Sequence, residues 1–393
     1  MMKDQVAEQK ASSGKYIPEL DGFRAIPMFF VLWGHFGAQY SHFWFPVQGF
    51  FILSGFLISR ILIKEKARSN GDFKSYFKTY WWRRSLRIFP IYYLYLFILI
   101  GLYFVLPDLA DLPRLILGLL TYTFNFMSPS ADIDFMHSKA FEITQHLWTM
   151  SVEEQFYIFL PLIIWFASER WLRIWTVFFI IGAFLFRIGL GAYYIETLPY
   201  PTVTGNFVRL NTLSHFDAFF MGVAINVFSL KRYKINWWWL FVVFFALFIG
   251  AGIWNVIDRL GQWDSVVYWS HLGYHISWYE NYEYVWCYTL INFSFMFCVL
   301  ALITQGERKP SLWGKLLKFK PLVLFGRLSY GVYTYHMLVL YFFSSFIYSA
   351  RKPEMWINVS YFILYVLLVF AVSWLSYEFF EKKFLRLKPE YSK

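Results

Sequence analysis

Long runs of hydrophobic residues alternate with short polar stretches from one end of the chain to the other. Each run is about twenty residues long, the length that crosses the roughly 30 Å hydrocarbon core of a bilayer as an α-helix. The pattern predicts ten membrane-spanning helices, at residues 24–43, 46–63, 86–106, 146–167, 174–194, 212–229, 236–255, 286–304, 323–344 and 356–377.

The lengths of these runs favour helices over a membrane barrel. Backbone groups within lipid must find hydrogen-bond partners inside the protein, and a continuous run near twenty residues does so as a helix. The strands of a barrel would alternate polar and apolar positions over about ten residues, and these segments do not. We therefore expect an all-α polytopic membrane protein.

Composition indicates the same class. Hydrophobic residues make up 58% of the chain and charged residues 16%, whereas a soluble domain has about 25% charged residues. Cys287 and Cys298 fall in one apolar run, which supports neither a disulfide framework nor a cysteine metal site, and no metal is expected. We expect residues 1–20 to form a polar tail without a cleavable signal peptide, residues 21–380 one integral membrane domain, and residues 381–393 a basic tail.

The net charge of +11 is unevenly distributed. Lys and Arg gather in alternate gaps between the spans and in the C-terminal tail, most densely from Arg60 to Arg87, while the gaps at 107–145 and 256–285 are acidic or nearly neutral. Basic residues of membrane proteins stay on the cytoplasmic side. The charge therefore predicts cytoplasmic termini, and it does not indicate a nucleic-acid partner.

The first span carries two ionisable residues, Arg24 and His35, in an apolar setting. Eleven residues are three helical turns plus about 20°, so the two side chains share a face and lie about 16 Å apart along the axis. If Arg24 is at the cytoplasmic interface, His35 lies near mid-membrane, where such groups face the protein interior or a wet cavity. His35 is then either a neutral histidine bonded to a neighbouring helix or a catalytic base.

Two further stretches suggest a narrow slot and an anion site. Ser54 and Gly55 lack bulk in the second span, so a ligand can approach there, although helix packing is the commoner use of small residues. Arg83, Arg84 and Arg87 cluster at the start of the third predicted span, where guanidinium groups and a helix N-terminus both favour phosphates. The alternative is a cytoplasmic anchor or a contact with lipid headgroups.

The fourth span opens with a histidine and two carboxylates. His146 and Glu153 are seven residues apart and share a helix face, and Glu154 follows directly. Carboxylates within a membrane segment are costly unless paired or protonated, and Arg187 in the fifth span is a candidate counter-ion. The pattern leaves a structural and a catalytic role equally open. His336, among aromatic residues of the ninth span, fits a packed histidine better.

The order of these motifs resembles that of the acyltransferase family 3 of integral membrane acyltransferases. The segments "YIPELDGFRAI" and "VLWGH" resemble its opening signature, an Arg and a His separated by ten residues. "FFILSGFLISR" resembles its second helix and "RRSLRIFPIYY" its basic cytoplasmic motif, while "HLWTMSVEEQFYIFLPL", "HFDAFFMGVA" and "LSYGVYTYHM" resemble later helices. The likeness runs in order along essentially the whole chain. Gln48-Gly49 and Lys382-Lys383 depart from the usual pattern.

The resemblance implies transfer of an acyl group, usually acetyl, from cytoplasmic acyl-CoA to a hydroxyl of a sugar or glycan at or beyond the membrane. In that interpretation Arg83, Arg84 and Arg87 bind the CoA phosphates. Ser54 and Gly55 line the slot for the pantetheine arm. Acyl-CoA is a co-substrate rather than a tightly bound cofactor.

His35 is the general base in this interpretation, Arg24 orients the donor or belongs to a charge network, and Glu153 is a third candidate catalytic residue. The expected partners are acyl-CoA, a sugar or glycan acceptor and membrane lipids, and the expected location is a bacterial inner membrane. The sequence leaves open the acyl chain and the acceptor, which is lipopolysaccharide, exopolysaccharide, peptidoglycan or a small glycosylated molecule.

Two other classes of function fit parts of the pattern. Buried ionisable residues also mark transporters and flippases, although no inverted repeat typical of transporters is evident in the sequence. A membrane scaffold whose histidines merely pack is the second alternative. Acceptor-dependent release of CoA is expected of an enzyme and not of a transporter, whereas the scaffold alternative predicts that His35→Gln leaves function intact.

Overall fold

The computed structural model is helical throughout its described part, which contains no β-strand. The residues that the structure describes are 16–36, 45–127, 135, 138–198, 204–261, 271–275, 278, 280–305, 312–347 and 355–388. The helices that overlap the ten predicted spans are α2 (Pro18–Phe36), α3 (Pro46–Arg68), α4 (Phe73–Tyr103), α9 (Trp148–Phe166), α10 (Glu169–Thr197), α12 (Phe216–Val227), α13 (Trp237–Asp258), α15 (Glu283–Gln305), α18 (Ser329–Ile347) and α19 (Met355–Ser376).

Six helices within these ranges are long and apolar enough to cross a membrane. They are α3, α4, α10, α13, α15 and the stretch Val359–Leu385, which joins α19 to α20 (Lys382–Leu385). The protein is therefore an all-α, multi-pass membrane protein, but the expected count of ten spans is not confirmed. Most of the two expected cytoplasmic tails, residues 1–15 and 389–393, lies outside the described residues, so the location of the termini stays a prediction.

The four helices that fall short, α2, α9, α12 and α18, are the more polar or shorter ones. Acidic residues begin α2, and Glu153 and Glu154 interrupt α9. Helix α12 has 12 residues, too few to cross a bilayer, and every one except Asn226 is buried. The charged residues of α2 and α9 are buried or half-buried inside the protein, so these helices tolerate polar residues that a lipid-facing surface does not.

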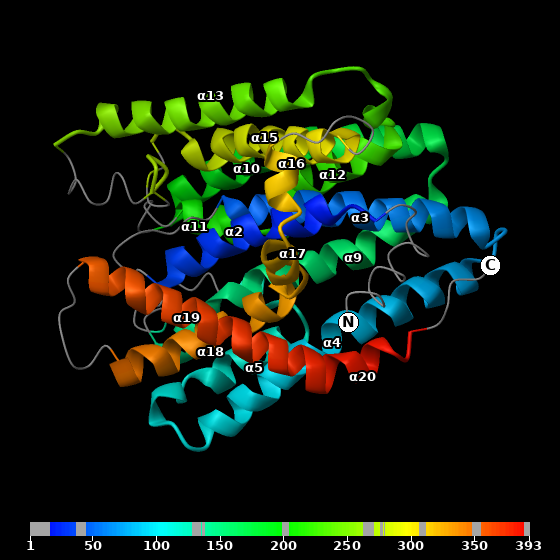
Figure 1. The fold of residues 1–393 in the computed structure, drawn as a ribbon. Helices are drawn as coiled ribbons and strands as arrows, with labels where there is room; N and C mark the ends of the chain where they lie inside the picture. The colour runs from blue at the N-terminus through cyan, green and yellow to red at the C-terminus, as the bar shows by residue number, and fades with distance from the viewer. Residues whose placement is uncertain are drawn as a thin grey trace.

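The long helices run roughly along one direction and pack in successive layers (Figure 1). Helix α13 packs on α15, and α10 on α12. Helices α2 and α3 lie in the middle, with α12 against α3, while α18 contacts α2, α4 and α19 on the other side. The short helices α16 (Leu312–Leu317) and α17 (Lys320–Arg327) run across the bundle and pack on α2.

The outer face of the bundle is apolar. Only 22% of the apolar stretch of α10, α13 and Val359–Leu385 is buried, against 61% for α3 and α15. Large side chains such as Phe178 on α10, Trp254 on α13 and Leu367 on α19 are exposed. An exposed apolar surface of this extent is typical of protein that faces lipid, so these helices separate the interior from the bilayer.

The most basic stretch of the chain is a helical hairpin rather than a loop. Helix α3 continues to Arg68, and α4 begins at Phe73, where Asp72 caps it by accepting bonds from Lys74 and Ser75 amides. Left-handed Asn70 (φ 46°) and Gly71 (φ 87°) make the turn. The predicted third span thus starts well inside α4. Arg83, Arg84 and Arg87 lie about three turns from the N-terminus of α4, so this N-terminus cannot contribute to an anion site at the arginines.

Candidate functional site

A cavity of about 320 Å³ runs between α3, α4, α9, α18 and the C-terminal helical stretch. Its wall on α3 is one helix face, with residues recurring every three or four positions from Val47 to Glu65. Eighteen residues of helix correspond to about 27 Å. The cavity is therefore long relative to its volume, a shape that suits an extended ligand. The residues of this stripe are Val47, Phe51, Ser54, Ile58, Ile61 and Glu65.

Basic side chains dominate one end of the cavity. Of the eight residues that the sequence singled out, six line it: Arg24, Ser54, Arg83, Arg84, Arg87 and Glu153. Arg327 and Lys388 line it as well. Four separate segments of the chain therefore bring cations to one chamber, which the sequence alone indicated only for the α4 cluster.

Arg24 belongs to a charge network at the start of α2. Its guanidinium lies 3.5 Å from Asp21, and the same carboxylate lies 3.2 Å from Arg327 Nε and accepts a 2.7 Å bond from the Tyr16 hydroxyl. Burial and the Asp21 carboxylate raise the pKa of Tyr16 to about 12, so this hydroxyl stays a donor at neutral pH. Gly326 allows α17 to approach here, because a Cβ at Gly326 would overlap the Asp21 carbonyl.

The three arginines of α4 are in different surroundings. Arg84 lies 3.5 Å from Glu154 and stacks over the ring of Tyr157, with 3.0 Å between its Cζ and the ring centre. Arg87, by contrast, is exposed and makes no ion pair with any described residue. Arg83 is half-buried. Arg84 therefore fastens α4 to α9, whereas the exposed Arg87 is the cation of α4 best placed to meet a ligand.

Glu153 faces the cavity and is held from two sides. Its Oε1 accepts a 3.4 Å bond from Ser54 Oγ, and its Oε2 accepts a 2.9 Å bond from the Tyr157 hydroxyl. Arg187, the counter-ion suggested from sequence, is elsewhere: it is fully buried and pairs with Asp217 at 2.7 Å. That suggestion is wrong because α10 packs on α12 rather than turning Arg187 toward α9.

Gly55 does not line the cavity. A Cβ at this position would overlap the backbone carbonyl of Phe219, and one at Gly222 would overlap the carbonyl of Ile52. The two glycines let α3 and α12 pack backbone to backbone, which is the common use of small residues in membrane helices. The structure therefore gives Gly55 a packing role and leaves Ser54 as the small residue on the cavity wall.

His35 lies in the last turn of α2, close to two other histidines, His146 and His336. The ring centres of His35 and His336 are 5.1 Å apart, and those of His336 and His146 are 4.7 Å apart. These rings do not line the cavity; Thr149 and Tyr333 do. The Tyr333 ring centre is 5.3 Å from that of His336. The three histidines therefore lie behind the part of the cavity wall that Thr149 and Tyr333 form, which we call the inner end of the cavity.

Sequence reasoning missed Thr149 and Tyr333 and left the roles of His146 and His336 open. Thr149 Oγ1 donates to the Tyr333 hydroxyl at 2.7 Å, and that hydroxyl donates to the His146 carbonyl at 2.9 Å. The signal available was that "HLWT" and "YTYH" each place a histidine three residues from a hydroxyl side chain. Across the described ranges, no group of three or more His, Cys, Asp or Glu side chains is arranged to hold a metal ion.

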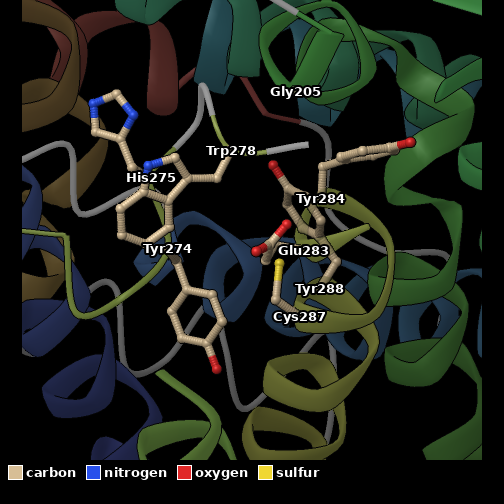
Figure 2. A pocket seen from close by; sticks show the side chains of 8 residues that line it. All are labelled: Gly205, Tyr274, His275, Trp278, Glu283, Tyr284, Cys287 and Tyr288. Atoms are coloured by element: carbon tan, nitrogen blue, oxygen red, sulfur yellow. The ribbon is translucent and has the colours of Figure 1, made fainter. Parts of the chain in front are cut away.

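A second cavity, beside α15, is far smaller, at about 20 Å³. Figure 2 shows the Glu283 carboxyl and the Cys287 thiol next to each other between tyrosine rings, with the His275 ring turned away. Glu283 forms a buried ion pair with Arg259. A space of this size holds about one water molecule, so it is not a substrate site.

Known acyltransferases are similar to this protein along nearly its whole chain. A family model described as an acyltransferase domain matches residues 17–378. The O-acetyltransferase OatA of Staphylococcus aureus strain NCTC 8325 / PS 47 is 26% identical over 388 residues, covering 96% of this chain and 59% of OatA. OatA of strain MRSA252 matches to the same extent.

The chain spans about 59% of the length of these relatives. No solved structure matches. The family match covers more than nine-tenths of the sequence and includes the positions of Arg24 and His35. On this basis, the chain belongs to the acyltransferase family 3 of integral membrane acyltransferases.

Proposed function

We propose that the protein transfers an acetyl group from cytoplasmic acetyl-CoA to a hydroxyl of a sugar or glycan at or beyond the membrane. The observation that carries the proposal is the cavity itself. It has cations at one end, a narrow wall along α3, and the histidine cluster behind its other end. The names of the relatives, which are O-acetyltransferases, support acetyl as the group transferred.

The donor would bind with its charged end among the arginines. Guanidinium groups bind phosphate oxygens through charge-assisted hydrogen bonds, and the exposed Arg87 lines the cavity beside Arg83. The CoA arm is long, thin and only weakly polar, so it suits the stripe of α3 residues around Ser54. Its thioester would then lie at the inner end, against Thr149 and Tyr333.

The chemistry proposed for His35 is general base catalysis. One ring nitrogen removes the proton of the acceptor hydroxyl, the oxygen bonds to the thioester carbonyl carbon, and the carbon–sulfur bond breaks. The proton on His35 then passes to the CoA sulfur, so the products are an acetyl ester and free CoA. The acceptor would enter from the side opposite the arginines, so that its hydroxyl lies between His35 and the thioester at the part of the cavity lined by Thr149 and Tyr333.

Arg24 and Glu153 act on the donor side in this proposal. Arg24 faces the same chamber as Arg87 while its own charge is partly balanced by Asp21 at 3.5 Å. Glu153, held by Ser54 and Tyr157, supplies a fixed negative charge among several cations. Together they set the local field along the path of the donor.

The direct test uses purified protein in detergent with acetyl-CoA and a panel of glycan acceptors. We expect CoA thiol release that depends on the acceptor, and a product heavier by one acetyl group. Replacing Arg83 and Arg87 together by Gln should raise the KM for acetyl-CoA by about 10-fold or more. The matched control replaces Arg170 and Arg173, exposed on α10. Acceptor transport into vesicles without CoA release would instead support a transporter.

A further inference from the structure

Arg209 is a half-buried cation that pairs with no carboxylate among the described residues. It lies on the short helix α11 (Thr204–Leu210). One terminal nitrogen donates to Asn206 Oδ1 at 2.8 Å, while its Nε is buried and has no hydrogen-bond partner in the described part of the chain. Asp217, the nearest acidic residue in sequence, is already paired with Arg187 at 2.7 Å. A guanidinium shielded from water without a counter-charge is costly, so Arg209 is suited to an anion from outside the protein.

The backbone at Arg209 is held in place by polar side chains of other segments. The Arg209 carbonyl accepts a 2.6 Å bond from His215 Nε2. Because a carbonyl only accepts, this nitrogen carries the ring proton, and the other ring nitrogen of His215 accepts a 3.1 Å bond from the Gln48 amide on α3. The next carbonyl, that of Leu210, accepts a 3.0 Å bond from Asn125. The position of Arg209 is therefore set before a ligand binds, which lowers the cost of ordering the site.

Arg209 lies close to the inner end of the cavity without lining the cavity itself. Its Cζ is 5.5 Å from the centre of the Trp148 ring, and Trp148 directly precedes Thr149 of the cavity wall. The charge of Arg209 also interacts with the Tyr333 hydroxyl. Figure 1 shows α11 at the end of the bundle opposite the α3–α4 turn. Arg209 is thus on the side from which the acceptor enters in the proposed function.

We propose that Arg209 binds an anionic group of the acceptor, a carboxylate or a phosphodiester, and so selects acidic glycans over neutral ones. The inference rests on the proposed function, in which the acceptor is a sugar or glycan. A guanidinium binds such oxygens through paired charge-assisted hydrogen bonds. Its single positive charge matches a singly charged group better than a doubly charged phosphate monoester. Arg209 is a positioning residue in this role, because it holds the acceptor and does not touch the reacting atoms.

The test uses matched pairs of acceptors that differ only in this charge. The first pair is a uronic-acid oligosaccharide with its carboxylates free or as methyl esters. The second is an oligosaccharide linked through phosphodiesters, against the same compound with each phosphate methylated to a neutral triester. We expect the wild-type protein to have a kcat/KM at least about 10-fold higher for the charged member of one pair. The pair that shows this preference identifies the anion.

Arg209→Gln should lower kcat/KM for the charged acceptor about 10-fold or more. The kcat/KM for its neutral partner and the KM for acetyl-CoA should stay within about twofold. Arg209→Lys keeps the charge and should keep part of the preference. A merely structural role would instead lower the rates with both acceptors alike. The control is Arg232→Gln, which removes an exposed cation of η5 (Leu230–Arg232) and should leave the preference unchanged.

The outcomes separate this inference from the proposed function. A wild-type protein that acetylates no acceptor contradicts the proposed function. A wild-type protein that acetylates neutral and charged members equally well, or an Arg209→Gln variant that keeps the full preference, contradicts only the role of Arg209. If Arg209→Gln fails to fold, Asn206→Ala decides, because it removes the side-chain bond that orients the guanidinium. We expect a smaller preference for the charged acceptor in this variant, and an unchanged one contradicts the inference.

Discussion

The guanidinium of Arg84 lies over the ring of Tyr157, with its Cζ 3.0 Å from the ring centre. The same group is 3.5 Å from the Glu154 carboxylate, and both side chains are almost fully buried. Arg84 therefore acts as a clamp between α4 and α9, whereas Arg87, one turn away, is exposed. Two arginines of one motif have separable roles.

Substitutions at these positions should differ in what they change. Arg84→Gln leaves the Glu154 charge buried without its cation, a loss of about 3–5 kcal/mol, and should lower the melting temperature clearly. Arg87→Gln should leave the melting temperature unchanged and raise the KM for acetyl-CoA about 10-fold. Thermal unfolding and steady-state kinetics on both variants measure this. Equal loss of stability in both would contradict the division of roles.

His35→Ala should abolish transfer while the protein stays folded. General base catalysis contributes about 10²–10⁴-fold, more than the loss of one half-buried packing contact takes from a folded enzyme. The measurement is acceptor-dependent CoA release, together with acetyl-CoA binding and thermal stability in the same detergent. Donor binding should be retained, because His35 does not line the cavity. A fully active His35→Ala protein overturns the proposed mechanism.

Ser54 is where the cavity wall should be most sensitive to volume. Ser54→Phe fills part of the passage along α3 and should reduce kcat/KM for acetyl-CoA by more than about 100-fold, since a long ligand cannot bypass the obstruction. Ser54→Ala removes only the 3.4 Å bond to Glu153 and should cost less than about 5-fold. Similar kinetics in the two variants would show that the donor follows another path.

Gly55 offers a contrasting test on a different face of the same helix. Gly55→Ala places a Cβ against the Phe219 carbonyl, and overpacking of this kind costs about 1–3 kcal/mol. The control is Gly182→Ala on α10, where a Cβ meets nothing within 4 Å and helix propensity should improve slightly. Yield of folded protein and melting temperature should fall for the first variant only.

The α3–α4 turn provides the test of orientation. Ala67→Cys and Ala110→Cys both place a thiol at an exposed position, while the native Cys287 and Cys298 are buried. If basic residues mark the cytoplasmic side, an impermeant reagent added outside intact cells should label residue 110 and not residue 67. Labelling of residue 67 and not of residue 110 would show the opposite orientation in the membrane.

Local relationships were predictable from sequence because helix geometry fixes them. Arg24 and His35 share the continuous helix α2, as their spacing predicts. Partners across helices were not predictable in the same way. Arg187 pairs with Asp217 and Glu154 with Arg84, and only the packing of α10 on α12 and of α4 on α9 determines those choices.

The candidate site residues also differ in whether they could be predicted from sequence. The cations of the cavity could be found from sequence, because charge in an apolar chain stands out. Thr149 and Tyr333 could not, since hydroxyl and aromatic side chains are common in this chain, which is 24% aromatic. Their importance comes from lying where the cavity meets the histidine cluster. Gly55 and Ser54 are adjacent in sequence, and only the helix neighbours show which faces the cavity.

The carboxylate of Asp21 contacts Arg327, which lies 306 residues further along the chain. This separation has a consequence for biosynthesis. When α2 leaves the ribosome it carries charges that cost about 2.5–3.5 kcal/mol each near the centre of an isolated membrane helix, and α17 does not yet exist. We expect α3, the first strongly apolar helix, to be recognised by the insertion machinery and to draw α2 in with it. Until α17 arrives, the nascent protein exposes uncompensated charge, so C-terminal truncation before residue 320 should send the chain to membrane proteolysis.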